Sequence, residues 1–391
     1  MMGIQDLKHY CFGQISWRAR QDMAPNTAEF ILLGAYRRDA YSGSGKDGLP
    51  VRGDIILDTT GHTSLAFGDG TFMFILKYII IAFSEKENWI LGRALDPVTE
   101  RKTILHTYPA PADPETEGPW KAGIKSTHRQ ALKEHVNNPG RGCQIETLVE
   151  FTTSNGSPVA FVPVFVNAPQ NSVFSFPVAV AAPDGDSLTC RLATDVEASG
   201  NAGGFTQPGR PLVPKPLTVD TDTYVVTWHT TGTKPGQLWS YQVMAEDGKS
   251  KAGVEAMIRI IKKAGEPPVC AAPDQTQSAP IGMLFNIDIV ASDPDGRVTA
   301  IEAINLPFWA TLNITTELPA ADAVASISGI PGPEDAGLHV LSIVATDNDG
   351  NQAVSPLKIK VDDGGFYAVH QHDYYKMSDK AISDKTMEIR A

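Results

Sequence analysis

Two stretches of the chain, IVASDPDGRVTAI (289–301) and IVATDNDGNQAV (343–354), decide the fold. Each is an apolar, strand-like run that ends in the same acidic turn, Ala-x-Asp-x-Asp-Gly. Looser copies occur in VAVAAPDGDSLTCRL (178–192) and YQVMAEDGKSKAGV (241–254). Val, Ile and Thr favour strands, whereas Asp-Gly pairs favour tight turns. The repetition predicts two successive β units built on one plan.

With 391 residues, the chain is long enough for several domains. We expect a β-rich N-terminal domain at 1–154, two sandwiches at 155–264 and 265–363, and a C-terminal tail at 364–391. The predicted fold class is all-β, with tandem immunoglobulin- or cadherin-like β-sandwiches after a less regular β-rich N-terminal domain. The connector KKAGEPPVCAAP (262–273) contains prolines and should be stiff, which favours sandwiches arranged in line.

The second unit carries a family resemblance in SDPDG, LPFWATLN and SISGIPGPEDAGLHVLSIVATDNDGNQAVSPLKIKV. It resembles the dystroglycan-type cadherin-like and immunoglobulin-like repeats of secreted and cell-surface proteins. The first unit is similar through AAPDGDSLTCRLA, LTVDTDTYVVTWHTT and GQLWSYQVMAEDG, so the resemblance spans about 156–363. Through LAFGDGT and ILHTY, residues 60–110 resemble a polycystic-kidney-disease-type repeat, with Ala66 in place of the usual Trp. The resemblance implies an extracellular or cell-surface protein and points to calcium.

The acidic turns predict a candidate metal site. In such a sandwich the loops after strands B and F lie at the same end, so SDPDG and ATDNDG should be neighbours in space. Neighbouring carboxylates repel one another unless a cation lies among them, and oxygen ligands on a flexible loop suit Ca²⁺. The candidate ligands are Asp293, Asp295, Asp347 and Asp349 in the second unit and Asp184, Asp186 and Asp247, beside Glu246, in the first.

Chain direction places each acidic set at the end of the sandwich that faces the preceding domain. Calcium at these positions would stiffen a joint between domains. A second interpretation stays open, because Asp-Pro-Asp-Gly and Asp-Asn-Asp-Gly also form stable turns without any metal.

Composition excludes several function classes. The formal net charge of -12 argues against nucleic acid and anionic membranes as partners. The longest apolar run, FMFILKYIIIAF (72–83), contains Lys77 and is too short for a membrane span. We find no nucleophile elbow, no H-E-x-x-H and no other catalytic set, so we expect the chain not to be an enzyme.

Three short motifs favour structural roles. SGSGKD (42–47) lacks the Ser or Thr and the strand-to-helix context of a phosphate-binding loop. VRGD (51–54) contains the integrin-binding tripeptide but leads into a strand. Trp228, Trp239 and Tyr241 recur at strand spacing, which favours core packing over a sugar-stacking platform.

These observations favour a non-enzymatic extracellular structural or adhesive protein with calcium-stiffened joints. A subunit of a surface filament or sheath is one version, because sheet edges and an unpatterned tail can pair with a second copy. The expected contact residues in the tail are Phe366, Tyr367, Tyr374 and Tyr375. The expected partners are therefore further copies or other surface proteins. The alternative is a carbohydrate- or glycoprotein-binding surface module that uses loops of the N-terminal domain.

Overall fold

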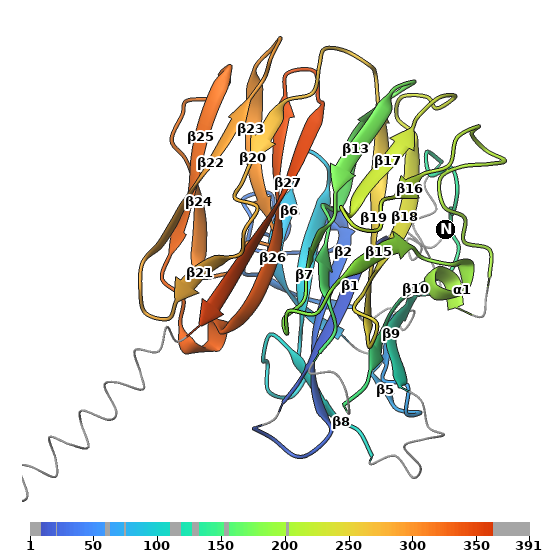
Figure 1. Ribbon diagram of the computed structural model, residues 1–391, viewed down its shortest axis with the longest axis vertical. Helices are drawn as coiled ribbons and strands as arrows, with labels where there is room; N and C mark the ends of the chain where they lie inside the picture. Colours follow the sequence, from blue (N-terminus) through green and yellow to red (C-terminus); the bar gives the residue numbers. More distant parts are fainter. Residues whose placement is uncertain are drawn as a thin grey trace, which may run out of the picture.

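The protein is described by a computed structural model in which nearly all regular structure is β-strand (Figure 1). The structure describes residues 9–20, 22–58, 63–73, 76–109, 119–126, 133–151, 156–200 and 203–362. The one α-helix in this part is the short α1 (Asp195–Ser199), and two 3₁₀ turns lie at Arg38–Ala40 and Pro333–Asp335. The predicted all-β class is confirmed.

The largest sheet joins the N-terminal strands to strands of the first sandwich. Its N-terminal members are β1 (His9–Ala19), β2 (Thr27–Arg37), β3 (Ile55–Asp58), β4 (Thr63–Ala66), β5 (Phe72–Met73), β6 (Leu76–Ser84), β7 (Trp89–Leu95), β8 (Ile104–Thr107), β9 (Trp120–Ser126) and β10 (Cys143–Val149). Its other members are β12 (Phe165–Pro169), β15 (Thr189–Leu192), β18 (Leu238–Glu246) and β19 (Lys251–Ile261).

Strand β19 is the link between the two regions. Its first half pairs with β1, in the register Gly13 to Glu255, and with β10, in the register Thr147 to Ala252. Its second half pairs with β12, and β18 lies along its other edge. Backbone hydrogen bonds therefore cross from the N-terminal strands into the first sandwich.

The first sandwich has its second layer in shorter strands. These are β11 (Val159–Phe161) paired with β14 (Ala179–Ala181), and β13 (Val173–Pro177), β17 (Val225–His229) and β16 (Thr218–Val219) in one small sheet. Both faces of β18 are buried, with Trp239, Tyr241 and Val243 alternating with polar residues that are equally covered.

The last sandwich is built from two four-stranded sheets. One contains β20 (Val269–Ala271), β22 (Phe285–Ser292), β25 (Asp322–Gly329) and β24 (Ala310–Ile314). The other contains β21 (Gln277–Pro280), β27 (Gln352–Asp362), β26 (Gly337–Asp347) and β23 (Val298–Ile304). Strand β22 alternates between buried and exposed side chains, as expected for a sheet with one solvated face.

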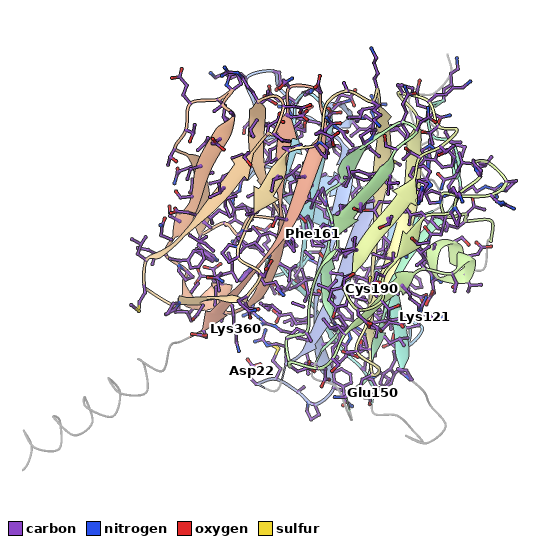
Figure 2. All side chains as sticks on the ribbon, turned by 45° about the horizontal axis from the view of Figure 1, so that its top comes forward. Asp22, Lys121, Glu150, Phe161, Cys190 and Lys360 are labelled. Carbon is purple, nitrogen blue, oxygen red and sulfur yellow. The ribbon has the colours of Figure 1, made fainter. Side chains whose placement is uncertain are left out.

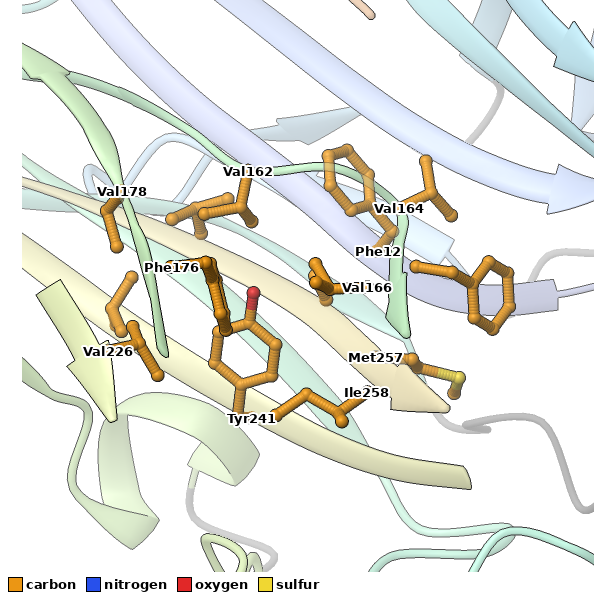
Figure 3. Close-up of a cluster of buried hydrophobic side chains, with 14 of the residues drawn as sticks. Phe12, Val162, Val164, Val166, Phe176, Val178, Val226, Tyr241, Met257 and Ile258 are labelled. Carbon is orange, nitrogen blue, oxygen red and sulfur yellow. The ribbon is translucent and has the colours of Figure 1, made fainter. Parts of the chain in front are cut away.

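One hydrophobic core runs through all three regions. It contains Phe12 and Leu33 from the N-terminal strands, many residues of the first sandwich, and Val340 and Val344 from the last one. Figure 3 shows Phe12 among side chains of the first sandwich. Separate cores fill the remainder of the N-terminal region and of the last sandwich.

The last sandwich lies beside the rest of the molecule, which differs from the expected in-line arrangement (Figure 1). The reason is strand β26, whose run HVLSIVA is apolar on both faces. Leu341, Ile343 and Ala345 fill the sandwich interior, whereas Val340 and Val344 join the shared core. An in-line arrangement would leave this second face in water, at a cost of about 25 cal/mol for each Å² of apolar surface.

Candidate functional site

The two acidic turns of the last sandwich lie side by side. The turn after β22 carries Asp293 and Asp295, and the turn after β26 carries Asp347 and Asp349. Two hydrogen bonds join them: the Arg297 amide donates to Asn348 Oδ1 at 2.6 Å, and the Asn348 amide donates to the Arg297 carbonyl at 3.0 Å.

Both turns contact the connector that joins the first sandwich to the last one. The Glu266 amide donates to both Oδ atoms of Asp295 at 3.2 Å. Asn351 Nδ2 donates to the Ala264 carbonyl at 2.8 Å. Gly265 has a φ of +60°, and a Cβ there would lie 2.7 Å from Asp349 Oδ2, so a side chain at this position would collide with the turn.

Asp347 organises its turn from a buried position, with 3% of its surface exposed. Its Oδ1 accepts hydrogen bonds from the amides of Asp349 and Asn351 at 2.8 Å, and its Oδ2 accepts one from Asn351 Nδ2 at 2.8 Å. Asn351 Oδ1 is buried and has no hydrogen-bond partner in the described part of the chain. Among the described residues, no three or more His, Cys, Asp or Glu side chains form a group that could hold a metal ion.

In the first sandwich, the carboxylates of the acidic turns are paired with Lys249 and Arg191. Lys249 Nζ lies 2.6 Å from Asp186 Oδ2, and Asp184 and Asp247 act on the same ammonium group. The hydrogen bond to Asp186 and the nearby carboxylates raise the pKa of Lys249. Glu246 is paired with Arg191 at 2.6 Å.

Arg191 belongs to a larger ion network beneath helix α1. It also donates to both carboxylate oxygens of Glu197 at 2.8 Å, and Lys251 Nζ donates to Glu197 and Glu146. Burial raises the pKa of Glu197, but the hydrogen bonds from Arg191 and Lys251 outweigh burial and hold the pKa well below its usual range. The network is therefore stable in its charged form at neutral pH.

The acidic turn before β19 in the first sandwich lies where that sandwich meets the N-terminal strands. Ser250, which ends the turn, donates through Oγ to the Leu148 carbonyl of β10. Trp17 Nε1 of β1 lies 3.2 Å from the same Oγ. The matching residue of the last sandwich is Gln352, whose Oε1 accepts a hydrogen bond from the Asn167 amide at 2.8 Å. Each turn therefore contacts the region that precedes it.

The Arg-Gly-Asp tripeptide has structural contacts at both charged ends. Arg52 donates to the carbonyls of Leu306 and Pro307 in the last sandwich and lies over the Phe308 ring. Asp54 accepts hydrogen bonds from Ser44 and from the Val51 amide within its own loop. Both side chains hold the fold together rather than projecting from it.

The aromatic residues weighed as a sugar platform are core residues. Trp228, Trp239 and Tyr241 are at most 1% exposed, and the two indoles form an edge-to-face pair. The core-packing interpretation is confirmed. The tail residues Phe366, Tyr367, Tyr374 and Tyr375 lie outside the described residues.

Sequence reasoning missed the role of Lys249. Its position directly after the turn glycine corresponds to Asn351 in the second unit, so comparing AEDGKS with ATDNDGN would have shown a cation in one turn and an amide in the other. The side-chain contacts to the connector had no such signal, because they depend on how the last sandwich docks.

A family of known proteins matches the N-terminal part of the chain. The profile of a family described as "Integrin beta-like protein A-E, N-terminal" matches residues 11–152. This match includes the segment that resembles a polycystic-kidney-disease-type repeat, which no comparison supports. The dystroglycan-type resemblance of about 156–363 stays a prediction. The search of curated protein sequences gave no match.

Solved structures with similarity to the chain contain immunoglobulin or fibronectin modules. The fibronectin(III)-like modules of Clostridium thermocellum CbhA share 15% identity over 52% of this chain and 93% of theirs, with a TM-score of 0.19. The N-terminal Ig1-2 module of the Drosophila receptor protein tyrosine phosphatase DLAR shares 14% identity over 53% and 99%, with a TM-score of 0.22. We draw no functional conclusion from similarities this weak.

No helix in the described part of the chain has the length and apolar character needed to cross a membrane.

Proposed function

We propose that the chain is a non-enzymatic adhesive or structural module that is displayed outside the cell or at its surface. The observation that carries the proposal is the match of residues 11–152 to the N-terminal region of integrin beta-like proteins. The shared core adds support, because it makes the three regions one stiff body that can transmit force between partners.

A bead assay tests this function. Beads coated with the full chain should aggregate with one another or attach to cells, whereas beads coated with heat-unfolded chain should do neither. Absence of both aggregation and attachment would contradict the proposal.

Self-association into a filament is the more specific version of the proposal. The tail residues 364–391, with Phe366, Tyr367, Tyr374 and Tyr375, are the proposed contact. Sedimentation velocity of the full chain and of a chain that ends at residue 363 separates this version from the general one. Equal assembly by both would exclude the tail contact and leave adhesion standing.

Calcium at the acidic turns of the last sandwich is a further part of the proposal. Asp293, Asp295, Asp347 and Asp349 have no ion-pair partner among the described residues, and buried Asn351 Oδ1 offers a free oxygen. These carboxylates do not lie close enough together to form a metal-binding group, so calcium binding would require them to move toward one another at the connector. The proposal assigns no calcium to Asp184, Asp186 and Asp247, because Lys249 already supplies a cation there.

A further inference from the structure

A large cavity lies where the three regions of the molecule meet. Its volume is about 1260 Å³, which exceeds the usual range for sites of drug-sized ligands. Strands β1, β2 and β7 form one side, the first sandwich forms a second, and β26 and β27 of the last sandwich form a third. Asp22 and Lys360, which line it from different regions, are labelled in Figure 2.

The N-terminal side of the cavity presents polar groups without partners. Gln14, Leu33 and Arg93 are directly paired across β1, β2 and β7, so their side chains share one face. Gln14 is 1% exposed, yet its Oε1 has no hydrogen-bond partner among the described residues. The same holds for the buried Nε of Arg93. Burial lowers the pKa of this guanidinium group, and the nearby carboxylate of Asp335 only partly offsets that effect.

The opposite side adds an acceptor and two cations. Asn305 is 8% exposed and donates through Nδ2 to the Val340 carbonyl at 2.7 Å, but its Oδ1 has no partner in the described part of the chain. Lys358 and Lys360 lie on the face of β27 that lines the cavity. Three buried polar atoms from two regions thus have unmet hydrogen bonds at one cavity.

The charges that remain free at the cavity are mostly positive. Among the acidic residues that line it, Asp22 and Glu29 are paired with arginines, Glu100 with Lys77, and Asp186 with Lys249. The cations that line it without an ion pair among the described residues are Arg93, Arg101, Lys102, Lys358 and Lys360. Asp184, Glu334 and Asp335 are the acidic residues left to oppose them.

We propose that this cavity binds a short acidic saccharide. Its hydroxyl groups would donate to Gln14 Oε1 and Asn305 Oδ1, and its carboxylate would accept from Arg93, with Lys358 and Lys360 nearby. Unpartnered buried acceptors and an unpaired guanidinium together require a ligand that offers both donors and negative charge. A long polyanion is disfavoured, because the chain as a whole carries a net charge of -12.

The apolar walls suit the faces of sugar rings. Val159, Leu188 and Tyr224 line the cavity from the first sandwich, and Phe308 lines it from the last. A ligand here would contact all three regions at once and would hold them together. The inference goes beyond the adhesive module proposed above, which needs no small ligand and would stand if saccharide binding failed.

Isothermal titration of the full chain tests the inference with three probes. Trigalacturonate should bind, whereas maltotriose, which is neutral, and inorganic sulfate, which lacks hydroxyl donors in a ring, should bind at least roughly tenfold more weakly. No binding of trigalacturonate at millimolar concentration would overturn the proposal. Equal binding of maltotriose or of sulfate would overturn it as well.

Substitutions locate the site. Arg93→Met should abolish trigalacturonate binding and leave the melting temperature unchanged or higher, because it removes a buried charge that makes no hydrogen bond or close ion pair among the described residues. The double variant Lys358→Gln/Lys360→Gln should weaken binding roughly tenfold. The matched control Lys262→Gln/Lys263→Gln makes the same change of charge on the exposed connector and should bind normally.

Binding that survives both Arg93→Met and the Lys358/Lys360 change would overturn the proposal. So would equal weakening by the two lysine pairs, since the attraction would then depend only on net charge. The lysine pairs keep the test decisive if Arg93→Met fails to fold.

Discussion

The two joints of this molecule are built by different means. The N-terminal strands meet the first sandwich through backbone hydrogen bonds, because β1 and β10 both pair with β19. The last sandwich meets the other regions through side chains: apolar contacts of Val340 and Val344, and polar contacts such as Asn167 with Gln352 and Gly350. Opening the first joint would expose strand edges, whereas opening the second would expose only side chains.

The acidic turns at the two joints also differ. At the first joint Lys249 and Arg191 neutralise the carboxylates, so the turn is electrostatically complete. At the second joint the carboxylates have no ion pair among the described residues, and hydrogen bonds of Asp295 and Asn351 hold the connector. One sequence motif can therefore form a turn whose carboxylates are paired with a cation or a turn whose carboxylates only accept hydrogen bonds, depending on the residue after the turn glycine.

The largest effect is expected from the core at the first joint. Phe161 is fully buried and packs edge to face on Phe12 of β1, with the ring centroids 5.9 Å apart. Phe161→Ala should lower the free energy of unfolding by about 3–5 kcal/mol, as measured by urea denaturation. The control Phe72→Ala, at a position 55% exposed, should cost far less. Similar losses in the two variants would contradict the packing assigned to this joint.

The next comparison is between the two turn carboxylates. Asp347→Ala removes the buried acceptor of three hydrogen bonds, from the Asp349 and Asn351 amides and from Asn351 Nδ2, and should cost about 3 kcal/mol. Asp247→Ala removes an acceptor for the Lys249 and Ser250 amides in a more exposed turn and should cost about 1 kcal/mol. Urea denaturation of both variants measures the difference in free energy of unfolding. A larger loss in Asp247→Ala would contradict the greater structural role given to Asp347.

Acid should weaken the first sandwich through Glu197. Its pKa is held below the usual range in the folded state, so its stabilisation is complete above the usual carboxyl pKa and is lost as pH falls. The melting temperature should therefore fall between about pH 5 and pH 2 in the natural chain and fall less in Glu197→Gln. Glu85→Gln, at an exposed position, should behave like the natural chain. An equal fall in Glu197→Gln would exclude this carboxylate as the cause.

Equivalent polar contacts should respond differently at the two joints. Ser250→Ala removes two hydrogen bonds to the preceding region, with Leu148 and Trp17, and Gln352→Ala removes one, so the two variants should cost about 2 and about 1 kcal/mol. Only Gln352→Ala should speed hydrogen exchange in the connector 262–268, because side chains alone hold the second joint. Equally fast exchange of the connector in Ser250→Ala would contradict the proposed difference between the two joints.

The smallest expected effect is that of calcium. If the acidic turns of the last sandwich bind the ion, calcium should raise the melting temperature above that in chelator, since a ligand of the folded state stabilises it. Asp295→Asn/Asp349→Asn should abolish the rise, and the matched pair Asp184→Asn/Asp186→Asn should keep it. An unchanged melting temperature of the natural chain would show that these turns do not bind calcium.

The sequence predicted the two sandwiches because strands such as β22 alternate between apolar and polar residues, as FNIDIVAS shows. The docking of the last sandwich was not predicted, although HVLSIVA in β26 is apolar on both faces and thereby signals a second buried surface. The pairing of β1 and β10 with β19 had no local signal, since it joins residues more than a hundred positions apart along the chain.

The site was predicted in part for the same reason. The acidic turns are local patterns, and the structure places Asp295 and Asp349 beside the connector, with Asp293 and Asp347 holding the two turns together from within. The cavity could not be foreseen, because Gln14, Arg93 and Asn305 meet only through the packing of three regions.

Differential scanning calorimetry of the full chain tests most directly whether one core unites the molecule. We expect a single transition in which the calorimetric and van't Hoff enthalpies agree, because Phe12, Trp228 and Val344 belong to the same core. Two or three separate transitions would contradict it and would show that the last sandwich unfolds independently.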